Sequence, residues 1–123
     1  MSQYPNIAIK SVRDLRENSM LSPRDAWESN AKRFYPHQLS SQKKGCPKST
    51  FLGLCEQGKI KGVKSGSYTR SKLNKQYGLK AVEYLITQPN LNETELWSLI
   101  SEKTPNEQMS VVIALFKNGD IQC

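Results

Sequence analysis

The chain has 123 residues, of which 37% are hydrophobic, and its 18 Lys and Arg against 11 Asp and Glu give a formal net charge of +7. This length and composition predict one domain over residues 1–123 with a single modest core. The sequence has neither an apolar run near the roughly 20 residues of a membrane span nor the hydrophobic centre of a signal peptide. Three cysteines are few, and because their number is odd they cannot all pair in a disulfide framework. We therefore expect a cytoplasmic protein without membrane contact.

Two helices are predicted in the first third of the chain. Apolar residues at helical spacing predict the first from about residue 6 to 18. The second begins with Ser22 as its N-cap and Pro23 at the first helical position, and it ends at Tyr35. Apolar residues repeat along it at i, i+4 and i+7, which indicates a buried aromatic face made by Trp27, Ala31 and Phe34.

The central region is predicted to hold a third helix followed by a short hairpin. Pro47 suits the first turn of this helix, and Gly58 suits the left-handed position at its end. Residues 59–69 then place Ile60 and Val63 between lysines and glycines ahead of a Ser-Gly-Ser turn, which predicts a β hairpin. The helix itself is mostly apolar and is expected to reach the core through Phe51, Leu52, Leu54 and Cys55.

Three further helices are predicted in the last part of the chain. The first covers about residues 73–87. Capping-box patterns open the other two, with Asn92 and Glu95 before a helix over 92–100 and Thr104 and Glu107 before a helix over 104–118. Ile121 is predicted to form one strand in the tail. The fold class is therefore mainly α: a single-domain helical bundle of about five or six helices with a short, wing-like central β hairpin.

The positive charge is concentrated in one segment. Residues 42–80 carry ten basic side chains against one acidic side chain, Glu56, and so hold a local charge of +9. A positive field of this density is typical of proteins that bind a polyanion. The side chains expected to contact phosphates are Lys43, Lys44, Lys48, Lys59, Lys61, Lys64, Arg70 and Lys72.

Residues 49–73 resemble the winged-helix modules of the phage excisionase type. In those modules a helix is followed by a GKIPAVKVG-x-x-Y hairpin and an R-S-x-L turn into the next helix. The resemblance implies nucleic-acid binding. Because the predicted helix is mostly apolar, phosphate contacts should outweigh base readout. The matching residues are Gly58, Lys59, Ile60, Val63, Lys64, Gly66, Tyr68, Arg70, Ser71 and Leu73.

Other patterns in the same segment suggest different functions. As an alternative to nucleic-acid binding, the basic face could dock on an acidic partner protein. The helix start behind Gly45 offers free amides to a small anion, although the first glycine of a P-loop is absent. Cys46 lies among lysines at that start, where a thiol becomes more reactive, and His37 is the only histidine that could act as its base. A zinc site from His37 and the three cysteines, Cys46, Cys55 and Cys123, lacks any C-x-x-C pair.

The chain also resembles an uncharacterised family of small bacterial proteins. The resemblance lies in a KGCP-x-x-x-FLGLC-x-x-G motif at residues 44–58, in DAWESNA upstream and in VVIALFKNG near the end. It implies a single bacterial domain and brings no activity or ligand. We therefore expect an accessory or regulatory protein that binds nucleic acid, with DNA favoured over RNA, or else an acidic protein. No catalytic residue, metal or cofactor is expected.

Overall fold

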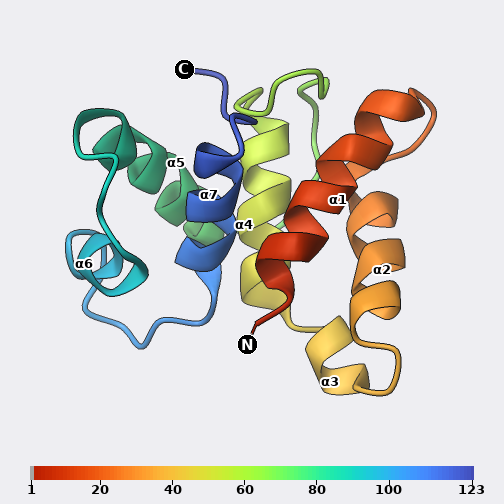
Figure 1. Ribbon diagram of the computed structural model, residues 1–123, viewed down its shortest axis with the longest axis horizontal. Helices are drawn as coiled ribbons and strands as arrows, with labels where there is room; N and C mark the ends of the chain where they lie inside the picture. Colours follow the sequence, from red (N-terminus) through yellow and green to blue (C-terminus); the bar gives the residue numbers. More distant parts are fainter. Residues whose placement is uncertain (1) are drawn as a thin grey trace.

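The computed structural model describes residues 2–123 and is mainly helical, as predicted (Figure 1). Six helices of at least six residues are joined by loops, and the single turn α3 lies between the second and third of them. No helix among these residues is both long enough and apolar enough to cross a membrane. The helices are α1 (Tyr4–Glu17), α2 (Pro23–Phe34), α3 (Leu39–Gln42), α4 (Gly45–Glu56), α5 (Lys72–Thr87), α6 (Glu93–Ser98) and α7 (Gln108–Lys117).

Local capping explains where several of these helices begin. The Ser22 hydroxyl accepts a hydrogen bond from the Asp25 amide at 3.1 Å, which confirms the predicted start of α2. Asn92 and Glu95 form both hydrogen bonds of a capping box, which confirms the start of α6. The predicted start of the last helix at Thr104 is wrong. Glu107 has a left-handed backbone with φ of 69°, and α7 begins one residue later.

The predicted β hairpin is not present, and an irregular loop occupies residues 59–71. The buried Ile60 instead forms a single antiparallel bridge with Ile121, so the predicted tail strand is reduced to that bridge. The Lys61 amide donates to the Asp120 carbonyl at 2.9 Å, and the Gln122 amide donates to the Lys59 carbonyl at 2.7 Å. The C-terminal tail therefore takes the backbone partners that a hairpin would have needed.

Helix α4 lies at the centre of the molecule, with α1 and α2 on one side of it and α5 on the other (Figure 1). Its residues 51–55 are all buried, which confirms the predicted core face. Close approach of α5 depends on Gly53, where an added Cβ would lie 2.7 Å from the Lys75 backbone. On the other side the Trp27 and Phe51 rings are 5.2 Å apart.

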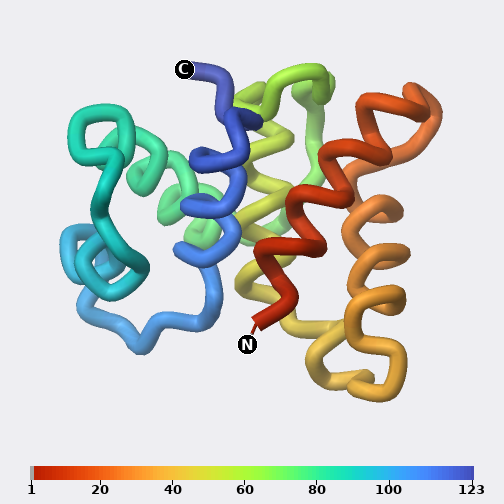
Figure 2. Tube along the Cα trace, in the orientation of Figure 1, coloured from red at the N-terminus to blue at the C-terminus, as the bar shows by residue number. Residues whose placement is uncertain are grey.

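The chain leaving α4 turns back on itself. It arches past the end of the helix and then descends toward the start of α5, as the green part of the trace shows (Figure 2). Both ends of this return path are fixed, by the Ile60 bridge at one and by the first turn of α5 at the other. Residues late in the loop are consequently carried back toward the first half of α4.

Candidate functional site

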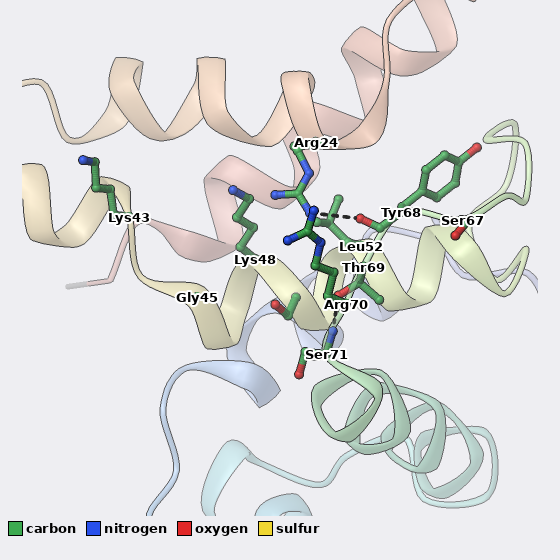
Figure 3. Close-up of a pocket in the computed structure, with 11 residues that line it drawn as sticks. Arg24, Lys43, Gly45, Lys48, Leu52, Ser67, Tyr68, Thr69, Arg70 and Ser71 are labelled. Carbon is green, nitrogen blue, oxygen red and sulfur yellow. Dashed lines mark hydrogen bonds between the residues drawn. The ribbon is translucent and has the colours of Figure 1, made fainter.

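The basic segment is divided by the fold. Lys43 and Lys44 precede α4, whereas Lys59, Lys61 and Lys64 follow it. A helix of 12 residues separates these two groups by about 18 Å, at 1.5 Å per residue. The return of the loop then brings Arg70 back beside Lys48, in the middle of the segment (Figure 3). The segment therefore does not present its charge as one uniform surface.

An open cleft of about 880 Å³ lies where this return meets α2 and α4. Four cations line it, one from α2, one from α4 and two from the flanking loops, and no acidic side chain is among its lining residues (Figure 3). The remaining lining is dominated by small hydroxyl-bearing residues. We call this feature the cationic cleft. It is lined by Arg24, Lys43, Gly45, Lys48, Ser49, Leu52, Ser67, Tyr68, Thr69, Arg70 and Ser71.

Two of the four cations have their charge free for a ligand. In the described part of the chain, the side chains of Lys43 and Arg70 make no hydrogen bond or ion pair. Lys48 donates to Glu28 on α2 at 2.5 Å, and this contact lowers the pKa of the Glu28 carboxyl. Arg24 uses one of its nitrogens on the Tyr68 carbonyl at 3.2 Å and keeps its other donors available.

The loop wall of the cleft is held in place by Glu56. One oxygen of its carboxylate accepts hydrogen bonds from the amides of Tyr68 and Thr69, at 2.7 and 3.1 Å. The other oxygen forms an ion pair with Lys75 at 2.7 Å. The ammonium of Lys75 and these two amides lower the pKa of Glu56 to about 2. The single acid of the basic segment is thus used inside the structure and leaves the cleft positive.

Helix starts add to the positive character of the cleft. Gly45 is the first residue of α4, and Ser71 is the N-cap of α5. The Ser71 hydroxyl accepts from the Asn74 amide at 3.3 Å, so its proton remains available to an acceptor in the cleft. The N-terminus of a helix carries a partial positive charge and favours anions. The cleft therefore combines cationic side chains, the positive ends of helix dipoles and hydroxyl donors, all of which favour an anion.

The structure brings together three of the eight predicted phosphate contacts. Lys43, Lys48 and Arg70 line the cleft. The Lys44 ammonium lies 5.7 Å from the centre of the Tyr4 ring, in a cation–π contact. The other four do not line the cleft and lie on the surrounding loop or at the start of α5, namely Lys59, Lys61, Lys64 and Lys72.

Arg24 is the cleft residue that sequence reasoning missed. It lies outside the basic segment. The sequence predicted only that it belongs to the first turn of α2 and gave it no function. One local signal does mark it. A cation in the first turn of a helix opposes the helix dipole, which favours acidic residues there. A basic residue directly after Ser22 and Pro23 is thus poorly explained by helix formation and better explained by a tertiary contact.

The cysteines do not assemble a second site. Cys46 is half-buried at the start of α4, and Cys123 is exposed at the end of the chain. Cys55 is buried in the core, and burial raises the pKa of its thiol far above the usual range. Within residues 2–123, no three His, Cys, Asp or Glu side chains are grouped to hold a metal ion.

Comparison with known proteins identifies a family and no activity. The model of a family described as "Family of unknown function (DUF6979)" matches residues 1–122. No curated protein and no solved structure matches the chain. The prediction of an uncharacterised family holds at that level, whereas the local resemblance to excisionases stays a prediction.

Proposed function

The chain belongs to this family of unknown function, and from its own residues we propose that it is a nucleic-acid-binding accessory or regulatory protein. The observation that carries the proposal is the cationic cleft, where cations from α2, α4 and two loops converge without an acid in the lining. Binding of this kind is directed at the phosphate backbone, since cationic side chains, hydroxyls and helix N-termini are the groups that contact phosphate oxygens.

The dimensions of the cleft suit a short stretch of backbone. Residues 45–52 of α4 line it over about 10 Å, which matches about three phosphates of a stacked strand at 3.4 Å each. The Tyr68 hydroxyl donates to the Lys64 carbonyl at 2.7 Å, so the exposed loop with its own lysines continues from the Tyr68 end. A strand leaving the cleft there would meet further positive charge.

Docking by insertion of α4 into a groove is not part of the proposal. Residues 50–55 of α4 are buried, and the helix is surrounded by α2, α5 and α7. Its first turns contribute Lys48 and Ser49 to the cleft wall. Affinity should therefore depend strongly on salt and only weakly on sequence.

Salt titration gives the first quantitative test. If the protein contacts three phosphates of a single strand, the slope of log K against log salt is about −0.7 per contact, and affinity falls about 20-fold between 50 and 200 mM salt. Fluorescence anisotropy with a labelled 20-nucleotide DNA, with an RNA of the same sequence and with a duplex measures this slope. Absence of binding at 20 mM salt to all three would disprove the proposal.

A pair of triple variants separates the cleft from net charge. R24A/K48A/R70A removes three cleft cations, and K59A/K61A/K72A removes three basic charges outside the cleft. Both proteins lose the same charge, so we expect the cleft variant to lose at least ten-fold in affinity and the control to lose much less. Equal losses would show that general charge binds the ligand. Circular dichroism checks that both variants fold.

The acidic-partner alternative is an outcome of the same assay. Polyglutamate, matched to the oligonucleotide in total charge, carries carboxylates in place of phosphates. If polyglutamate competes as well as DNA does, and the cleft variant weakens both equally, the basic face is a docking surface for acidic proteins. Selective competition by DNA supports nucleic-acid binding.

A further inference from the structure

The geometry of the cationic cleft points to a more specific ligand group: a phosphomonoester, the terminal phosphate carried by a phosphorylated strand end or by a mononucleotide. This inference rests on the proposed nucleic-acid function and narrows it. A diester in the backbone carries one negative charge, whereas a monoester carries −1.5 to −2 near neutral pH and has three oxygens that accept hydrogen bonds.

The arrangement of the cations favours the doubly charged group. The side chains of Arg24, Lys48 and Arg70 come from distant parts of the sequence and converge on one region of the cleft, whereas Lys43 lies apart (Figure 3). A row of diesters would be met by cations spread along the cleft. Three cations around one point match a single concentrated charge. Two of them are arginines, whose planar guanidinium groups can each bind two phosphate oxygens.

Uncharged donors also line the cleft. In the described residues the hydroxyls of Ser49 and Ser67 have no hydrogen-bond partner, and the Ser71 hydroxyl is used only as an acceptor. The starts of α4 and α5 lie at the same cleft. Helix starts and hydroxyls are the groups that surround terminal phosphates in many proteins. A monoester has enough free oxygens to use them.

The volume of the cleft leaves room for the nucleotide that carries the phosphate. Small-molecule sites measure about 300–1,000 Å³, and the cleft, with about 880 Å³, lies in that range. Leu52 is buried behind the wall of the cleft, and the partly buried Tyr68 lies at one end of it. The cleft is therefore large enough for a terminal nucleotide together with its phosphate.

Glu28 acts on this site from outside its lining. It holds the Lys48 ammonium at 2.5 Å while its own side chain is 46% exposed. A bound phosphate has to share Lys48 with this carboxylate, so Glu28 weakens binding by repulsion and competition. Glu28→Gln removes the charge and keeps the shape, and it should tighten binding of a terminal phosphate several-fold. If the ligand does not contact Lys48, Glu28→Gln will not increase its affinity.

The test compares strand ends at equal charge. A 10-nucleotide DNA with a 5′-phosphate is compared with a 12-nucleotide DNA that ends in a 5′-hydroxyl and has nearly the same total charge. A 3′-phosphorylated 10-mer and deoxyadenosine 5′-monophosphate form the other arms. We expect at least five-fold tighter binding of one phosphorylated strand, and competition by the mononucleotide if the terminal nucleotide alone is recognised. Arg70→Ala should abolish this preference, and Lys72→Ala, outside the cleft, should keep it.

Each outcome has one meaning. If the phosphorylated and hydroxyl strands bind equally well, the monoester inference is wrong and the nucleic-acid proposal stands. If no strand binds at low salt, the proposed function itself fails. If the mononucleotide binds and the strands do not, the ligand is a free nucleotide, and the monoester chemistry survives without the nucleic acid. A preference unchanged in Arg70→Ala places the site elsewhere and overturns the inference.

Discussion

Substitution of Glu56 tests the idea that one partly buried carboxylate holds the wall of the cleft. Glu56→Gln keeps the size of the side chain and an oxygen that can accept from the Tyr68 and Thr69 amides. It removes the charge that pairs with Lys75 at 2.7 Å. The variant should fold, because the core is untouched, but it should be less stable than the wild type.

The magnitude follows from the pKa of Glu56. A fall from the ordinary value of 4.5 to about 2 corresponds to about 3 kcal/mol of stability at neutral pH. The side chain is 16% exposed, so water screens part of the interaction, and we expect a loss of about 2 kcal/mol. The group is more acidic in the folded state. Its contribution is therefore complete above pH 4.5 and is lost as the pH falls toward 2.

Urea unfolding followed by tryptophan fluorescence measures this contribution, since Trp27 and Trp97 are both buried. The difference in unfolding free energy between the wild type and Glu56→Gln should be about 2 kcal/mol at pH 7 and less than half of that at pH 3. Glu83→Gln changes an exposed acid of α5 and should have no such pH-dependent effect. A difference that is the same at pH 7 and pH 3 would refute the assigned role of the charge.

Two further substitutions test how the elements around the cleft are packed. Gly53→Ala places a Cβ 2.7 Å from the Lys75 backbone and should lower the free energy of unfolding, measured in urea, by about 1–3 kcal/mol. Gly45→Ala is the control, because its added Cβ meets nothing within 4 Å. Equal stability of the two variants would contradict the close approach of α4 and α5. Alanine substitution of Arg16, of Asp120 and of both should give a coupling energy of about 1–2 kcal/mol, because their ion pair of 2.8 Å has a buried carboxylate and a partly exposed guanidinium. Additive effects would show that this contact does not hold the tail to α1.

The predictions from sequence were correct for features that depend on a few neighbouring residues. The N-cap at Ser22 and the capping box of Asn92 and Glu95 were predicted correctly, since a cap needs only residues within one turn. The core face of α4 was likewise evident from its apolar residues. The start of α7 was not, because the hydroxyl of Ser110 takes the Glu107 carboxylate that a capping box at Thr104 would require.

The position of the candidate site depends on contacts that no local pattern contains. The sequence by itself determined the helical class, most helix starts and the concentration of positive charge in residues 42–80. Only the tertiary structure decided that Ile60 pairs with Ile121, that the loop returns along α4 and that Arg24 and Arg70 line the same cleft. Helix formation is governed by neighbours within one turn, whereas the path of a polar loop is fixed by whichever distant groups satisfy its backbone donors. For this loop those groups include the carbonyl of Asp120 in the tail and the carboxylate of Glu56.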